Sequence, residues 1–125
     1  MVTISLLSPG GCSKRAVPSV SVEELHGLIE EGRDIFLLDV RRQEEYAAGR
    51  LSSIDLRIPH DSLEGNLDLL PQDKLTCIYC ICRGGVRSGT AVEYLRSVGY
   101  DSAFNVAGGM LAWQELGYET VADSL

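Results

Sequence analysis

Hydrophobic and polar residues follow two different spacings along this chain, one typical of helices and the other of buried strands. Between residues 21 and 32, apolar side chains recur at intervals of three or four, which predicts a helix with one buried face. Ser21 followed by Glu24 has the pattern of a capping box at its start, and Gly32 predicts its end. Residues 34–40, in contrast, form a short and nearly continuous apolar run. Such a run is typical of a strand buried on both faces of a parallel sheet.

The remaining sequence continues this alternation of helical and strand patterns, with glycine and proline residues between them. Further helices are expected at residues 44–48, 62–70, 88–98 and 110–116, and further strands at residues 54–58, 75–82 and 102–106. Strands that alternate with helices indicate an α/β fold, in which helices cover both faces of a parallel sheet. Ligands of such sheets bind at the carboxyl ends of the strands.

Length and composition indicate one domain. A chain of 125 residues is large enough for a single hydrophobic core, and its apolar and charged fractions are ordinary for a globular protein. We expect an irregular N-terminal extension at residues 1–19, in which residues 2–7 are the one candidate for a strand. The folded domain is then expected at residues 20–119, followed by a C-terminal tail at residues 120–125.

Charge and cysteine content narrow the choice of partners and compartment. A formal net charge of −7 argues against nucleic acid and acidic membrane surfaces as partners, because both favour a basic protein. The first residues lack the basic start and the long apolar stretch of a secretory signal, and no segment is as long as a transmembrane helix. We therefore expect a cytoplasmic protein whose four cysteines are free thiols.

The most reactive chemistry is expected where the strand at residues 75–82 ends. The sequence C-I-C-R-G-G-V-R-S runs from Cys80 to Ser88 and places cysteines directly before two glycines and two arginines. The glycines allow several backbone N–H groups to face one point, while the arginines and the start of the next helix add positive potential. Such surroundings lower the pKa of a thiol from its usual value of about 8.5. The sequence therefore predicts a reactive thiolate in this loop.

Motifs in four parts of the chain resemble those of the single-domain rhodanese family of sulfurtransferases, in the same order and with approximately the same spacing. They are L-L-D-V-R at residues 37–41, E-E-Y-A-A-G-R at residues 44–50, C-R-G-G-V-R-S at residues 82–88 and V-A-G-G-M-L-A-W at residues 106–113. The resemblance covers residues 20–119. It implies the rhodanese-like fold, with a central parallel five-stranded sheet and helices on both faces.

The resemblance also implies a reaction. In that family the loop cysteine takes a sulfane sulfur from a donor such as thiosulfate, holds it as a persulfide and passes it to cyanide or another thiophilic acceptor. This chain would then be a thiosulfate sulfurtransferase, with a small sulfur-donor anion and a thiol or a protein sulfur acceptor as partners. The covalent persulfide would be its intermediate, and no cofactor or metal is expected. Other rhodanese-like modules are non-catalytic binding or regulatory domains, and those usually lack the loop cysteine.

Cys80 and Cys82 compete for the role of the nucleophile. Cys80 follows a tyrosine, as the family's cysteine usually does, whereas four residues separate Cys82 from Arg87, as the family's loop requires. We assign Cys82 on this spacing and keep Cys80 as the alternative. In related phosphatases and arsenate reductases, five residues lie between the loop cysteine and the loop arginine. Neither Cys80 nor Cys82 has that spacing to Arg87. The anion-binding loop then comprises Arg83, Gly84, Gly85, Val86, Arg87 and Ser88.

Supporting roles are expected for several neighbouring residues. Arg83 is expected to meet the donor anion, and Arg87 to fix the loop and add positive charge. Asp39 resembles the family's aspartate beside the active loop, and we expect it, with Arg41 as a weaker candidate, to orient an arginine or backbone groups. Cys80 is either a core residue or a second thiol that reacts with an oxidised Cys82.

Cys77 is the third cysteine of the apolar run, and we expect it to face away from the other two because strand residues alternate between faces. Cys77 and Cys80 have the separation of half a zinc knuckle. They lie in an apolar run rather than in a turn, and the chain has no second pair, so zinc is a minor alternative.

Overall fold

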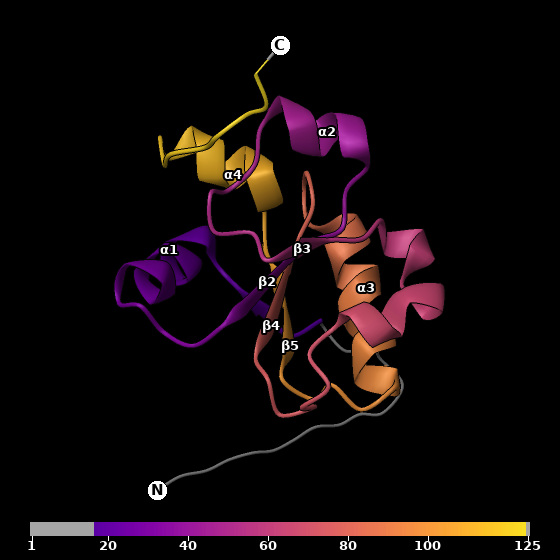
Figure 1. Ribbon diagram of the computed structural model, residues 1–125. Helices are drawn as coiled ribbons and strands as arrows, with labels where there is room; N and C mark the ends of the chain where they lie inside the picture. Colours follow the sequence, from indigo (N-terminus) through magenta and orange to yellow (C-terminus); the bar gives the residue numbers. More distant parts are fainter. Residues whose placement is uncertain (1–16, 125) are drawn as a thin grey trace, which may run out of the picture.

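The computed structural model describes residues 17–124, and its helices and strands alternate as the sequence predicts (Figure 1). The elements are β1 (Ser19–Val20), α1 (Val22–Glu30), β2 (Phe36–Asp39), α2 (Gln43–Ala48), β3 (Leu56–Arg57), the 3-10 helices η1 (His60–Ser62) and η2 (Glu64–Leu69), β4 (Ile78–Ile81), α3 (Val86–Ser97), β5 (Ala103–Val106) and α4 (Gly109–Glu115). The candidate strand at residues 2–7 lies outside the described residues. No helix among residues 17–124 has the length and apolar character needed to cross a membrane.

The strands form one parallel sheet in the order β1-β5-β4-β2-β3. β4 lies in the middle, and its register pairs Cys80 with Leu38 on β2 and with Asn105 on β5. Helices α1 and α4 lie on one side of the sheet and α3 on the other (Figure 1). The expected fold class, a five-stranded parallel sheet with helices on both faces, is thereby confirmed.

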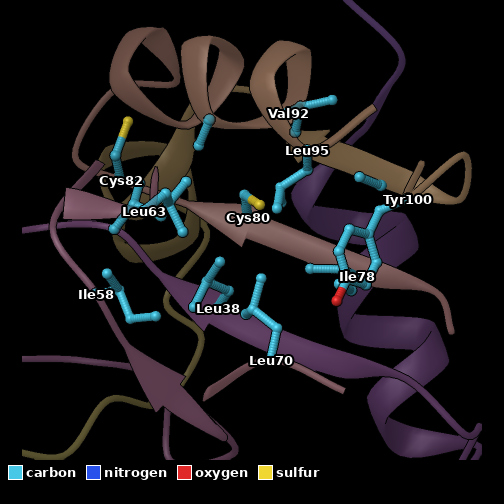
Figure 2. Close-up of a cluster of buried hydrophobic side chains, with 13 residues drawn as sticks. Leu38, Ile58, Leu63, Leu70, Ile78, Cys80, Cys82, Val92, Leu95 and Tyr100 are labelled. Carbon is cyan, nitrogen blue, oxygen red and sulfur yellow. The ribbon is translucent and has the colours of Figure 1, made fainter. Parts of the chain in front are cut away.

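Side chains of β4 alternate between two hydrophobic clusters, one on each face of the sheet. Ile78 and Cys80 belong to the cluster that includes residues of α3, together with Cys82 just after the strand (Figure 2). Tyr79 and Ile81 belong to the cluster that includes residues of α1 and α4. Because helices cover both faces, all residues of this strand are buried. This double burial explains the continuous apolar run in the sequence.

The first helix follows the sequence prediction closely. The Ser21 hydroxyl accepts a hydrogen bond of 3.0 Å from the Glu24 N–H, and the Glu24 carboxylate accepts one of 2.8 Å from the Ser21 N–H. This is the expected capping box. At the other end, Gly32 adopts a left-handed φ of 68° just past the helix.

The helix predicted at residues 62–70 is wrong in type, because the chain forms the two short 3-10 helices η1 and η2 there. Asn66 leaves helical geometry, with φ −132° and ψ 24°, and its side-chain amide donates a hydrogen bond of 2.7 Å to the Ser62 carbonyl. Asparagine competes in this way for backbone groups, and the adjacent Gly65 is a poor helix former. Leu63 and Leu70 nevertheless reach the core.

Both edges of the domain differ slightly from the expected boundaries. Ser19 already belongs to β1 and pairs with Asn105, so the sheet begins one residue before the expected domain start. Near the other end, Val121 and Arg50 exchange two backbone hydrogen bonds of 2.9 and 2.8 Å. Part of the expected tail therefore packs back on the domain.

Helix α4 holds the segment that follows β4. The N–H of Met110 donates to the Cys82 carbonyl at 2.9 Å, and the N–H of Leu111 donates to the Arg83 carbonyl at 3.0 Å. First-turn N–H groups have no partner within their own helix. These contacts therefore give hydrogen-bond partners both to the N–H groups of α4 and to the carbonyls of the loop. The approach requires Gly109, where a Cβ would lie 2.7 Å from the Arg83 carbonyl oxygen and even closer to that of Cys82.

We expect Gly109→Ala to push α4 away from the loop and to destabilise the protein more than Gly117→Ala does. Gly109 and Gly117 share a left-handed φ, 57° and 79° respectively, but a Cβ at Gly117 meets nothing within 4 Å. Gly117→Ala should cost about 1 kcal/mol from backbone strain, and Gly109→Ala about 2 kcal/mol more from the clash. Urea unfolding of both variants measures the difference. Equal losses of unfolding free energy in the two variants would contradict a close contact between α4 and the loop.

Candidate active site

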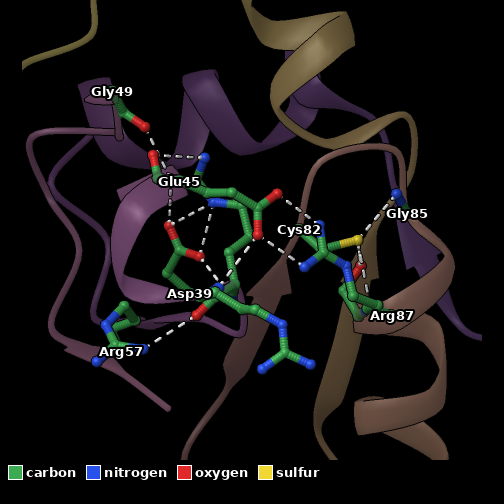
Figure 3. A network of polar contacts seen from close by, with 10 residues as sticks. Asp39, Glu45, Gly49, Arg57, Cys82, Gly85 and Arg87 are labelled. Atoms are coloured by element: carbon green, nitrogen blue, oxygen red, sulfur yellow. Dashed lines mark hydrogen bonds and ion pairs between the residues drawn. The ribbon is translucent and has the colours of Figure 1, made fainter. Parts of the chain in front are cut away.

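The loop between β4 and α3 curls around the sulfur of Cys82 (Figure 3). The backbone N–H of Gly85 donates to Cys82 Sγ at 3.0 Å, the N–H of Ser88 at 3.3 Å and the Ser88 hydroxyl at 3.2 Å. Gly85 adopts a left-handed φ of 104° at the start of α3, which turns its N–H toward the sulfur. The structure thus places Cys82, rather than Cys80, at the focus of the loop donors.

These donors decide the ionisation of Cys82. Burial by itself raises the pKa of the Cys82 thiol, since the residue is only 1% exposed. Hydrogen bonds from the hydroxyl and N–H of Ser88, and from the backbone of Gly85 and Gly84, outweigh this effect. The net result is a pKa below the ordinary thiol value, so at a given pH more of Cys82 is thiolate than of an ordinary cysteine.

Cys80 lies in an apolar environment instead. Its side chain is fully buried in the cluster between the sheet and α3 (Figure 2). Burial raises the pKa of the Cys80 thiol far above its usual value, and the neighbouring Cys82 raises it further. Cys77 packs against the cluster on the opposite face, as predicted, so Cys77 and Cys80 do not face a common metal position. Among residues 17–124, no group of three His, Cys, Asp or Glu side chains could hold a metal ion.

Arg87 pairs with Glu45 of α2 and makes no hydrogen bond to Cys82 among the described contacts. Its two terminal nitrogens each donate to one carboxylate oxygen at 2.8 Å. The hydrogen bond from Arg87 lowers the pKa of Glu45 to about 2, and the same contact raises the pKa of Arg87. The ion pair therefore fixes the start of α3 against α2.

Asp39 and Arg41 form a buried ion pair beside this contact. Arg41 donates from Nε and a terminal nitrogen to the Asp39 carboxylate at 2.9 and 2.8 Å, and the two side chains are 6% and 0% exposed. Arg41 also donates to the carbonyls of Glu45, within α2, and of Gly49, just after its end. Both residues thus act on α2 and, through Glu45, on Arg87, while neither makes a hydrogen bond to Cys82 among the described contacts.

Arg83 and Val86 point outward from the loop. Val86 is 81% exposed, and Arg83 is also exposed. Every other arginine among residues 17–124 donates to a carboxylate or a backbone carbonyl, whereas the Arg83 guanidinium has no such partner within this range. It borders a hollow of about 190 Å³ whose remaining lining residues are Arg41, Glu45, Ala48, Gly49, Met110, Leu111 and Gln114.

Sequence reasoning missed two residues that belong to this site. Glu45 lies within the second motif, but only the fold shows that it pairs with Arg87. Asn105 of β5 is buried and lies 2.5 Å from the Ser88 hydroxyl. The signal for Asn105 was a strongly polar residue inside an otherwise apolar strand pattern, which demands a hydrogen-bond partner.

The arrangement can support nucleophilic chemistry by a thiolate. Donors converge on the sulfur and would stabilise a negative charge on it or on an atom bound to it. Among the described contacts no histidine or carboxylate hydrogen-bonds to Cys82, so the site activates its thiol through donors rather than through a neighbouring base.

Comparisons with known proteins agree with this geometry. A family profile for the rhodanese-like domain matches residues 21–116. The chain is 36% identical over 110 residues to the human thiosulfate:glutathione sulfurtransferase, covering 78% of this chain and 94% of that protein. It is 39% identical over 94 residues to the adenylyltransferase and sulfurtransferase uba4 of Ogataea parapolymorpha, where it covers 75% of this chain but spans only 23% of that relative.

A solved structure gives the same result for the fold. The crystal structure of a rhodanese-like domain protein from Staphylococcus aureus superimposes with a TM-score of 0.74 at 38% sequence identity. The match covers 86% of this chain and 99% of that one. The similarity thus extends over nearly all of the described residues.

The Glu45–Arg87 ion pair has a predictable pH dependence. Because the pKa of Glu45 is lowered from 4.5 to about 2, its stabilisation is fully present above the unfolded value and is lost as the pH falls toward 2. We expect Glu45→Gln to unfold at lower urea concentration than wild type near about pH 7, and this difference to shrink below about pH 4. Glu44→Gln, at an exposed neighbour without an ion pair among the described residues, is the matched control. A difference that does not change with pH would contradict the ion-pair account.

Proposed function

The chain belongs to the rhodanese-like domain family, and on that basis we propose that it is a sulfurtransferase that carries sulfane sulfur on Cys82 as a persulfide. The observation that carries this proposal is the convergence of the Gly85 N–H, the Ser88 N–H and the Ser88 hydroxyl on the Cys82 sulfur. A persulfide is an anion at neutral pH, and such donors stabilise it as they do the thiolate.

The first half of the reaction loads the enzyme. The Cys82 thiolate attacks the outer sulfur of thiosulfate, a new S–S bond forms, and the original S–S bond breaks. Sulfite leaves with the electron pair of the broken bond, so Cys82 is left as an anionic persulfide. No proton transfer is required in this step, which fits the lack of a base hydrogen-bonded to Cys82 among the described residues.

The second half of the reaction unloads the enzyme. A nucleophile such as cyanide or a thiolate attacks the outer sulfur of the persulfide, and the S–S bond to Cys82 breaks. The Cys82 thiolate leaves and returns to its donors, so the cycle needs no external oxidant or reductant. The name of the human relative joins thiosulfate to a thiol, glutathione. We propose the same classes here, a small sulfur-donor anion and a thiol acceptor.

The structure favours this reaction over phosphatase or arsenate reductase chemistry. Those reactions need an arginine directed at a tetrahedral oxyanion within the loop. Here both terminal nitrogens of Arg87 are occupied by Glu45. A purely binding role is also less favoured, because such a role gives no reason to gather donors around a buried sulfur.

We expect Cys82→Ser to abolish sulfur transfer from thiosulfate to cyanide, with a loss of at least about 10³-fold in thiocyanate formation. Cys80→Ser should keep most of the activity, because Cys80 is a buried core residue. Cys80→Ala serves as its control, since it avoids placing a hydroxyl in an apolar cluster. The reverse pattern would contradict the assignment of Cys82. An inactive wild type that hydrolyses phosphate esters or reduces arsenate would contradict the proposed function.

Arg83 is proposed to attract the donor anion, because its guanidinium lacks a partner among residues 17–124 and borders the hollow beside the loop. We expect Arg83→Glu to raise the KM for thiosulfate by about tenfold at low ionic strength and by less at high salt. Arg33→Glu makes the same charge change near the amino end of β2, whereas Arg83 follows the carboxyl end of β4, so it should leave the KM nearly unchanged. Equal effects of the two substitutions would show a general charge effect and exclude this role for Arg83.

A further inference from the structure

Asn105 is a polar side chain on β5 whose position suggests a role in the chemistry of Cys82. It is 8% exposed, and its Oδ1 lies 2.5 Å from the hydroxyl oxygen of Ser88. Ser88, which is fully buried, contacts Cys82 Sγ on its other side. On the far side, Asn105 Nδ2 donates to the Ser19 hydroxyl at 3.5 Å. The three side chains of Cys82, Ser88 and Asn105 thus form a continuous chain of hydrogen-bonding groups.

Two glycines lie next to the Asn105 amide. A Cβ at Gly85 would lie 3.8 Å from Asn105 Nδ2, and one at Gly89 would lie 3.9 Å from the same atom. The amide therefore lies close to the backbone of the active loop and to the first turn of α3, with β5 fixing its other end. This close approach ties the position of Asn105 to that of the loop donors.

The hydroxyl of Ser88 has only one proton for two neighbours. When Cys82 is a thiol, its S–H can donate to Ser88 Oγ while Ser88 donates to Asn105 Oδ1. When Cys82 is an anion it can only accept, so the Ser88 proton must turn toward the sulfur. Ser88 Oγ and Asn105 Oδ1 would then be two acceptors 2.5 Å apart without a proton between them. An amide can relieve this conflict because rotation brings its N–H group to the position of its oxygen.

We propose that Asn105 is a positioning residue that lets Ser88 donate its proton to the anionic sulfur of Cys82. Its amide oxygen accepts from Ser88 in the thiol form, and its N–H donates to Ser88 in the anionic form. The proton lost by Cys82 passes to solvent, and no oxidant or reductant takes part. The role of Asn105 toward the Cys82 thiolate is independent of the proposed function. The same role toward a Cys82 persulfide rests on that function.

Other charged and titratable groups around Cys82 are shared by all variants of the test. Cys80 lies on β4, two residues before Cys82, and Arg87 of α3 acts on Cys82 by charge. Arg87 is itself neutralised by Glu45 of α2, with Asp39 of β2 close enough to act on it. Cys80 is the sheet neighbour of Asn105, but none of these groups makes a side-chain hydrogen bond to the Asn105 amide among the described contacts. An effect of Asn105 on Cys82 through Ser88 can therefore be separated from them.

The test is a double-mutant cycle on the pKa of Cys82, with Asn105→Leu, Ser88→Ala and the double variant. Thiolate absorbance near about 240 nm is titrated against pH for each, with Cys82→Ser in the same background as the blank. Asn105→Leu removes the Asn105 bond to Ser88 in both forms, but hydrogen bonds that lead to an anion are charge-assisted and stronger, so the loss costs the anionic form more. We therefore expect Asn105→Leu to raise the pKa of Cys82 by about half to one unit in wild type and to leave it unchanged when Ser88 is already alanine. Asn105→Ala, which adds no volume, replaces Asn105→Leu if the latter does not fold.

A rise of equal size in both backgrounds would overturn the proposal, because Asn105 would then act on Cys82 without Ser88. An unchanged pKa in wild type would overturn it as well. Thermal unfolding of each variant shows that the titrated protein is folded. The absorbance measurement needs no turnover, so its result does not depend on the proposed function. Failure of the proposed function would show separately, as a wild type that forms no thiocyanate from thiosulfate and cyanide.

Discussion

The sulfur of Cys82 is held by hydrogen-bond donors in a buried position, and the surrounding structure depends on that constraint. Burial alone opposes ionisation, so the donors of the loop have to outweigh it. They can do so only if the backbone curls tightly at Gly85 and if the carbonyls of the same loop are satisfied elsewhere. Helix α4 meets the second need by donating to the carbonyls of Cys82 and Arg83. The central strand β4 delivers the sulfur to this point because both of its faces are covered.

Ion pairs around the loop serve mainly to hold α2 and α3 in place. Arg41 is buried against Asp39 and donates to the carbonyls of Glu45 in α2 and of Gly49 just after it, and Arg87 pairs with Glu45. A buried charge that loses its partner is costly, so these contacts fix the geometry of the site even where they do not touch the sulfur. Because these arginines are engaged, Arg83 is left as the loop cation that faces the hollow and could meet an incoming anion.

The sequence predicted the parallel α/β fold, the capping box at Ser21 and the buried central strand because those features depend on local patterns and on periodicity. It misjudged residues 62–70, where Asn66 redirects its side chain to the backbone and replaces an α-helix by 3-10 turns. Loop spacing pointed to Cys82, and the structure places the donors there. The partners Glu45 and Asn105 could not be deduced, since they reach the loop from α2 and β5, and only the packing of the sheet brings them together.

The most direct test of this account is intact-protein mass spectrometry without reductant, after incubation with thiosulfate and again after cyanide. Wild type and the Cys80→Ser variant should each gain the mass of one sulfur atom, about 32 Da, and lose it with cyanide, whereas Cys82→Ser should gain none. A gain that persists in Cys82→Ser, or the lack of any gain in wild type, would contradict the claim that Cys82 carries sulfur as a persulfide.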